Sequence, residues 1–247
     1  MAHTDVFDDL EAEQQQLESV LARLSPADWA TPSAAAGWTI ADVVLHLAQT
    51  EEAVTATVGA HGDPVRWHEL GATVDEAMGA LVAAERGDGE QIFGRWRVAR
   101  RDAVAALRAA DPHQPVRWVA TPLKPPTLAT TRLAEHWAHA LDITVPLGVG
   151  YPDTARLRHV AWLGMGTLPY AFRLAGLPPA PVRCDLTAPD GSQWLLGDPS
   201  ADSVISGPAA DFCRVGAQRL PPGDSKLQVS GPHGATALRL LRNYAVS

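Results

Sequence analysis

The sequence predicts an α+β protein in which a helical bundle precedes a small strand-containing domain. The first two-thirds carry apolar residues at helical spacing, in long runs separated by breaks rich in proline and glycine. From about residue 181 the spacing changes to the alternation of half-buried strands, with turn sequences between the runs. We therefore expect a bundle domain over residues 1–150, then a connecting helix and a small α+β domain over 151–247.

Four helical runs account for the first domain, and we expect them at about 6–24, 39–58, 74–110 and 127–147. Ser25-Pro26 is expected to end the first run. Thr39 with Asp42 three residues later forms a near capping box at the start of the second. The third has a break at 87–89, and a proline-rich loop over 111–126 precedes the fourth. Long helices joined in this way predict a four-helix bundle.

The last third combines helices and strands. Its predicted helices are 154–174, 207–219 and 234–244, and its predicted strands are 182–188, 193–196 and 226–230. The sequence Pro189-Asp190-Gly191 has strong turn chemistry and is expected to join the first two strands into a hairpin.

Composition and charge exclude several classes of function. The net charge of -8 disfavours nucleic acid and anionic membrane as partners, because both require a basic surface. The only clustered cations, Arg95, Arg97, Arg100 and Arg101, are expected on a solvated helix face. The chain contains no apolar run of the roughly 18 residues that a membrane span needs, and its start is unlike a signal peptide. These features predict a cytoplasmic protein.

The two cysteines and the glycine-rich stretches carry no recognisable catalytic motif. Cys184 and Cys213 lack metal-knuckle spacing, and we expect both to be buried as small apolar residues in a reducing compartment. The sequence has no phosphate-binding loop, no dinucleotide fingerprint and no Gly-x-Ser-x-Gly elbow.

A candidate metal site is the strongest chemical feature. Glu135 and His139 are four residues apart in the fourth helical run, so both side chains can face one ion. His46 lies on the apolar side of the second run and is the candidate third ligand. Three protein ligands with open positions are typical of a catalytic metal. Imidazole and carboxylate ligands favour zinc, and nickel, iron and manganese remain alternatives.

Other residues of the fourth run bear on this site. His136 is an alternative ligand to Glu135, since it also shares a helix face with His139. Asp142 is placed to hold the far ring nitrogen of His139, and Arg132 to orient the Glu135 carboxylate. Trp137 faces away and is expected in the core. The alternative for His46 is a core histidine bonded to the backbone. The remaining histidines are expected to be solvated: His3, His61, His68, His113, His159 and His233.

Two segments resemble a known superfamily. Residues 32–47 (PSAAAGWTIADVVLHL) resemble the helix-2 signature of the DinB-like superfamily, in particular the branch of mycothiol-dependent maleylpyruvate isomerases. Residues 135–142 (EHWAHALD) resemble the second signature of that branch. The last third is similar to an actinobacterial metal-binding subfamily at LRHVAWLG (157–164), LTAPDG (186–191) and GPAADFC (207–213). The resemblance thus covers nearly the whole chain.

The resemblance implies a DinB-like bundle that binds a divalent ion through His46, Glu135 and His139. It implies that the ion holds a low-molecular-weight thiol, mycothiol in that branch, as a thiolate that attacks an electrophile. Relatives also contribute an arginine from the second domain, for which Arg214 and Arg219 are the candidates here. The Lys124–Pro126 loop and His136 depart from the family pattern and put the substrate in doubt.

These features lead to a main hypothesis and two alternatives. The main one is a metal-dependent isomerase or S-transferase that acts on a small electrophilic metabolite. The first alternative is a metal-assisted cyclase, isomerase or hydrolase that uses no thiol. The second is a metal- or ligand-binding protein without turnover. The substrate, the metal, the use of a thiol and the choice between monomer and homodimer stay open at this point.

Overall fold

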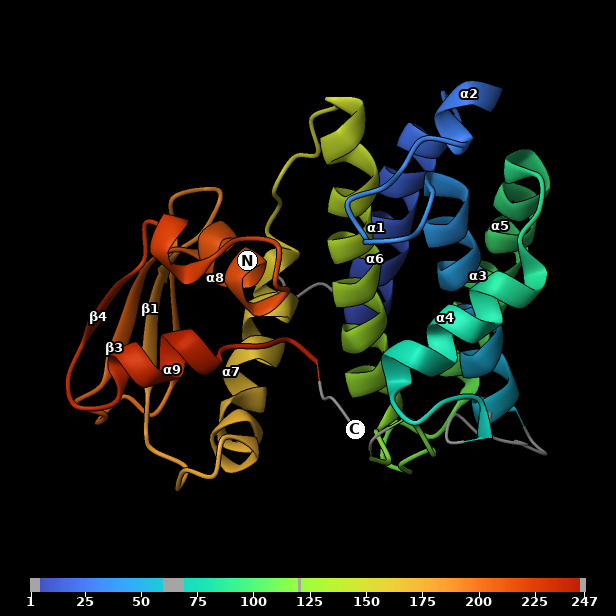
Figure 1. Ribbon diagram of the computed structural model, residues 1–247. Helices are drawn as coiled ribbons and strands as arrows, with labels where there is room; N and C mark the ends of the chain where they lie inside the picture. Colours follow the sequence, from blue (N-terminus) through green and yellow to red (C-terminus); the bar gives the residue numbers. More distant parts are fainter. Residues whose placement is uncertain (1–4, 60–68, 120, 245–247) are drawn as a thin grey trace. The chain divides into compact units, whose positions relative to one another are not determined.

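The computed structural model describes residues 5–59, 69–119 and 121–244 (Figure 1). The chain divides into two compact units, the first ending at Tyr151 and the second beginning at Pro152. The first unit is helical, and the second combines helices with a mixed β-sheet. The predicted α+β class is therefore confirmed.

Four long helices build the first unit: α1 (Val6–Leu21), α3 (Ile40–Val58), α5 (Gly89–Ala109) and α6 (Pro125–Leu147). Helix α3 packs along α5, α1 packs along α6, and α3 also contacts α6. The shorter helix α4 (Val74–Glu85) packs against α3. Large apolar side chains fill the bundle, including Leu10, Leu17, Leu45, Trp96, Leu128 and Trp137. The helices that matter for function, α3 and α6, are thus neighbours across this core.

Local capping explains where these helices begin and end. The expected capping box of α3 is present, since Thr39 Oγ1 accepts the Asp42 N–H and the Asp42 carboxylate accepts the Thr39 N–H. Asp88 caps α5 within the predicted break and separates it from α4. Helix α6 stops at Gly148, whose φ of 65° is the left-handed conformation common after a helix end.

Two predicted boundaries differ from the structure, and in both places proline lies in the first turn of a helix, where it is tolerated. Helix α1 ends at Leu21, and Ser25-Pro26 instead begins the short helix α2 (Pro26–Trp29), where Ser25 and Asp28 form a capping box. The prolines of the predicted Lys124–Pro126 loop belong to α6, which starts at Pro125 with Lys124 as its N-cap residue.

The arginine cluster on α5 is less solvated than predicted. Arg100 is only 8% exposed, lies over the Trp96 ring and pairs with Glu18 of α1. Arg97 also pairs with Glu18. Arg95 pairs with Glu52 and Glu85. The charged face of α5 therefore links this helix to its neighbours, because acidic side chains of α1, α3 and α4 lie opposite it.

The second unit begins with α7 (Leu157–Leu174) and contains one mixed sheet in the order β2-β1-β3-β4. Its strands are β1 (Arg183–Thr187), β2 (Gln193–Gly197), β3 (Val204–Pro208) and β4 (Gln228–Ser230). The predicted hairpin is confirmed, since β1 and β2 pair antiparallel across the turn at Asp190 and Gly191. Strand β1 also pairs in parallel with β3, and β4 pairs antiparallel with β3.

Strand β3 was not predicted. Its last two residues, Gly207 and Pro208, were assigned to the following helix, but α8 spans only Ala209–Gly216. The strand is short and its pairing with β1 is non-local, so the local pattern alone does not reveal it. A 3-10 turn (Pro222–Asp224) and α9 (Gly234–Leu240) complete the unit. As expected, Cys184 and Cys213 are buried. Within the described ranges, no helix is long and apolar enough to cross a membrane.

Candidate metal centre

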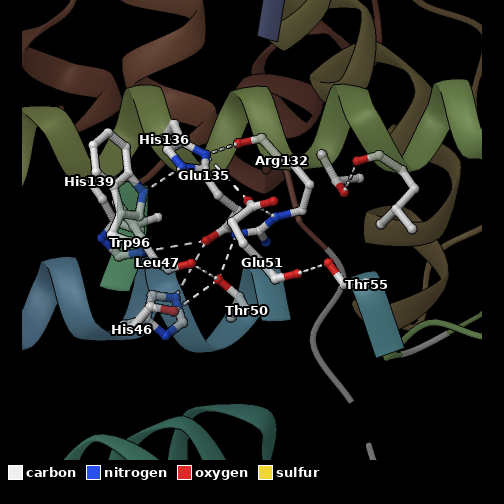
Figure 2. Close-up of polar contacts among 12 residues, drawn as sticks. His46, Leu47, Thr50, Glu51, Thr55, Trp96, Arg132, Glu135, His136 and His139 are labelled. Atoms are coloured by element: carbon white, nitrogen blue, oxygen red, sulfur yellow. Dashed lines mark hydrogen bonds and ion pairs between the residues drawn. The ribbon is translucent and has the colours of Figure 1, made fainter. Parts of the chain in front are cut away.

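Helices α3 and α6 bring the three predicted ligands together (Figure 2). His46 lies on α3, and Glu135 and His139 lie one turn apart on the same face of α6. One ligand atom from each residue lies within 4.8 Å of the other two. Residues almost ninety positions apart in the sequence therefore form one compact cluster inside the first unit.

The distances in the cluster suit a shared ion better than direct hydrogen bonds. Glu135 Oε2 is 3.4 Å from His139 Nε2 and 3.8 Å from His46 Nε2. Strong hydrogen bonds between such atoms are shorter than 3.2 Å. Two ligands on a tetrahedral ion, each ~2.1 Å from it, lie about 3.4 Å apart. The three side chains thus fit a divalent metal ion as a donor set.

His46 is held in the form that binds metals. Its burial lowers the pKa of the imidazole to about 4, so the ring is neutral near pH 7. Its Nδ1 is buried and has no hydrogen-bond partner among the described residues. Buried ring nitrogens normally have partners. The alternative of a core histidine bonded to the backbone is therefore not what the structure contains.

Glu135 marks the side of the cluster that solvent reaches. Its side chain is 34% exposed, against 8% for His46 and 11% for His139. Burial opposes ionisation of the carboxyl group. The contacts with His139 and His46, together with the positive charge of Arg132, outweigh this effect and hold the pKa of Glu135 well below its usual range. The carboxylate is therefore charged and approachable.

Asp142 orients His139 as expected. Its Oδ2 lies 2.9 Å from His139 Nδ1 and accepts the Nδ1–H, which leaves Nε2 of the same ring facing Glu135. Burial by itself lowers the pKa of His139, but the carboxylates of Asp142 and Glu135 raise it overall. A carboxylate behind a histidine in this way is common at metal sites.

Trp38 is a member of the site that sequence reasoning did not assign. Its ring centroid lies 5.1 Å from that of His46 and 6.4 Å from that of His139. The loop before α3 holds it, since Ser33 Oγ donates to the Trp38 carbonyl and Arg86 to the Gly37 carbonyl. The signal was available, because Trp38 belongs to the segment that resembles the superfamily signature.

His136 cannot take the place of Glu135 as a ligand, because both of its ring nitrogens are used elsewhere. Nε2 accepts the indole N–H of Trp96 at 3.1 Å, and Nδ1 donates to the Arg132 carbonyl at 2.8 Å (Figure 2). The ring is fully buried, and this burial lowers its pKa to about 3. His136 is therefore a neutral bridge between α5 and α6.

Arg132 also differs from the expectation. Its guanidinium does not serve to orient Glu135 directly but donates to Glu51 and Thr50 on α3, at 2.8 and 2.6 Å. Glu51 is fully buried, and no sequence pattern had indicated a role for it. Trp137, in contrast, lies in the core as expected.

The candidate arginines lie in the second unit, outside the ligand cluster's own unit. Arg214 donates from both terminal nitrogens to Asp153, and Arg219 donates to the Ala217 carbonyl. Their catalytic role stays a prediction. Among the other histidines, His113 and His233 are exposed as expected and His159 is half-buried. His3, His61 and His68 lie outside the described residues.

Comparison with known proteins supports the resemblance seen in the sequence. A family model described as the mycothiol maleylpyruvate isomerase N-terminal domain matches residues 10–144, which include all three candidate ligands. An uncharacterized protein of Mycobacterium tuberculosis strain H37Rv is 37% identical over 218 residues, covering 85% of this chain and 84% of that protein. Its counterpart in strain CDC 1551 matches equally well.

Solved structures show the same fold. The crystal structure of the mycothiol-dependent maleylpyruvate isomerase superposes with a TM-score of 0.62 at 16% identity, covering 91% of each chain. A point mutant of that isomerase superposes with a TM-score of 0.61 at 15% identity, covering 87% of this chain and 89% of the other. At such low identity these two structures establish the architecture alone.

Proposed function

The chain belongs to the mycothiol maleylpyruvate isomerase family, and on this premise we propose that it is a metal-dependent enzyme of the thiol-dependent isomerase or S-transferase type. Its metal ligands are His46, Glu135 and His139. The observation that carries the proposal is the convergence of their ligand atoms within 4.8 Å of one another. The cluster combines two imidazole nitrogens with one carboxylate, which makes zinc the first metal to test, followed by nickel, iron and manganese.

A bound divalent ion lowers the pKa of a coordinated thiol, so that the thiol binds as the nucleophilic thiolate. Each residue has a distinct part in holding such a site. Asp142 keeps the proton on Nδ1 of His139, and burial keeps His46 neutral. Glu135 supplies negative charge and lies on the solvent-accessible side, where a thiol and a small electrophilic substrate can enter.

The thiol must come from a separate molecule. Burial raises the pKa of Cys184 to about 12 and also raises that of Cys213, so neither forms a thiolate near pH 7. Mycothiol is the thiol that the family's name suggests, and maleylpyruvate is the first electrophile to test. We keep Arg214 and Arg219 as candidate catalytic residues. Arg214→Lys and Arg219→Lys are expected to lower turnover without changing metal content if either contacts the substrate.

The decisive experiment combines elemental analysis with thiol-dependent turnover. Protein purified without a metal-binding tag should contain about one equivalent of a divalent metal, and His46→Ala should lose it. His113→Ala is the matched control, since His113 is exposed. Metal affinity that is unchanged in His46→Ala would overturn the proposal.

Turnover assays then separate the two alternatives from the main proposal. Product formation that requires mycothiol supports a thiol-dependent enzyme. Equal turnover in thiol-free buffer would instead indicate a metal-assisted reaction with water or a single substrate. Tight ligand binding without any product would indicate a binding protein.

A further inference from the structure

A buried ion pair joins the two ligand-bearing helices beside the candidate metal centre (Figure 2). Arg132 Nε on α6 donates to Glu51 Oε1 on α3 at 2.8 Å. The two side chains are 3% and 0% exposed. The same guanidinium donates to Thr50 Oγ1 at 2.6 Å. Arg132 therefore holds two consecutive residues of α3.

Stability alone does not account for this pair. Removing two charges from water is costly, and replacing a buried pair with apolar residues of similar size is often neutral or stabilising. Here the pair is also incompletely satisfied, because Glu51 Oε2 is buried and has no hydrogen-bond partner among the described residues. Its presence calls for a role other than stability.

The contacts of the pair reach the backbone of one ligand and the helix turn that carries another. Thr50 Oγ1, which accepts from Arg132, donates to the His46 carbonyl at 2.9 Å. On the other side, Arg132 precedes Glu135 by three residues, and its own carbonyl accepts the His136 Nδ1–H at 2.8 Å. A short chain of contacts thus runs from the backbone of one ligand on α3 to the helix turn that carries another on α6.

The charges around the cluster also match a divalent ion. Arg132 contributes one positive charge, and Glu51, Glu135 and Asp142 contribute three negative charges when ionised. Burial raises the pKa of Glu51, and the facing Arg132 guanidinium opposes this rise. Metal binding requires both facing imidazoles to be neutral. Two net negative charges then remain, which is the charge that a divalent cation balances. Without Glu51, the net charge around the cluster would be one unit less negative, and the unpaired Arg132 cation would repel the ion.

We propose that the Arg132–Glu51 pair is a positioning element of the metal centre. It sets the spacing of His46 on α3 against Glu135 and His139 on α6, and Glu51 neutralises the arginine that performs this task. The proposal rests on the proposed function, since it assumes that these three residues bind a metal.

The test is the double variant Arg132→Met/Glu51→Leu, which removes both charges and keeps the side-chain volume. Zinc affinity is measured by competition with a chromophoric chelator, and the thermal unfolding midpoint is measured on metal-free protein. We expect a midpoint equal to or above that of the wild type and a zinc affinity lowered by about tenfold or more. A double variant that binds zinc as tightly as the wild type would overturn the proposal.

Two further variants make the result specific. Arg95→Met/Glu52→Leu removes the partly exposed ion pair between α5 and α3, whose side chains are 35% and 43% exposed, and should leave zinc affinity unchanged. Thr50→Val removes the hydroxyl between Arg132 and His46 at constant shape. It should weaken zinc binding several-fold. If the double variant does not fold, Thr50→Val alone tests the positioning role. Wild-type protein that binds no metal would overturn the proposed function, whereas unchanged affinity in Thr50→Val and the double variant would overturn only the positioning role.

Discussion

The Oδ2 atom of Asp142 lies 2.9 Å from Nδ1 of His139, and this hydrogen bond directs Nε2 of the same ring toward Glu135. Asp142 has a second contact, because its backbone carbonyl accepts the N–H of Ala34 at 2.9 Å. Ala34 belongs to the loop that carries Trp38. One residue therefore orients a candidate ligand and anchors the loop beside it.

Asp142→Asn should weaken metal binding while the fold persists. The amide has nearly the same shape but lacks the charge that favours Nδ1–H on His139. Loss of such a partner typically lowers metal affinity about 10–100-fold. Chelator competition measures the affinity, and circular dichroism checks the fold. If the affinity of the folded variant equalled that of the wild type, Asp142 would have no part in orienting the ligand.

His136→Gln should change the pH dependence of folding without changing metal affinity. Because burial lowers the pKa of His136 to about 3, the unfolded chain binds a proton there between about pH 3 and 6.5 that the folded chain does not. Stability therefore rises with pH across this window, by about 1.4 kcal/mol per pH unit for one proton. Chemical unfolding of metal-free protein at pH 4.5 and 5.5 should give a shallower slope in the variant.

The same variant distinguishes a structural from a ligating role for His136. Glutamine can accept from Trp96 and donate to the Arg132 carbonyl, so it can replace both contacts of the imidazole. The lowered pKa of His46 also makes stability rise with pH between about pH 4 and 6.5, so the variant keeps a residual slope of stability against pH. Loss of bound metal in a folded His136→Gln variant would identify His136 as a ligand after all.

Cys184 and Cys213 should resist alkylation in the native protein. Both are buried, and this burial raises the pKa of each thiol, so the thiolate is scarce at pH 8. Mass spectrometry after iodoacetamide treatment should find both unmodified under native conditions and modified in denaturant. Rapid native labelling of either cysteine, with loss of turnover, would point to an internal nucleophile and against an external thiol.

Trp38 should report metal binding by fluorescence. Its indole lies against both candidate histidine ligands, so a quenching ion such as Co²⁺ or Cu²⁺ bound there lies close to the ring. Titration with Co²⁺ should quench part of the emission at a one-to-one ratio, and Trp38→Phe should lose most of that change. Trp194→Phe is the matched control in the second unit. Equal quenching in wild type and Trp38→Phe would place the bound ion elsewhere.

Local sequence was sufficient for most of the helices and for the composition of the ligand cluster. Thr39 and Asp42 form the capping box that their spacing predicts, and Glu135 and His139 share a face because a helical turn places them there. The hairpin between β1 and β2 likewise follows from its turn residues. These features depend on contacts between residues a few positions apart, and such contacts can be read directly from a sequence.

Tertiary structure decided the features that depend on distant residues. The sequence alone left His136 as a rival ligand, and only the approach of Trp96 from α5 shows that its Nε2 is occupied. Arg132 contacts Glu51, 81 positions away, because the packing of α3 against α6 brings them together. Strand β3 forms through its pairing with β1. The sequence by itself determined which residues can bind an ion, and the packing of α3 against α6 decided which of them face one another.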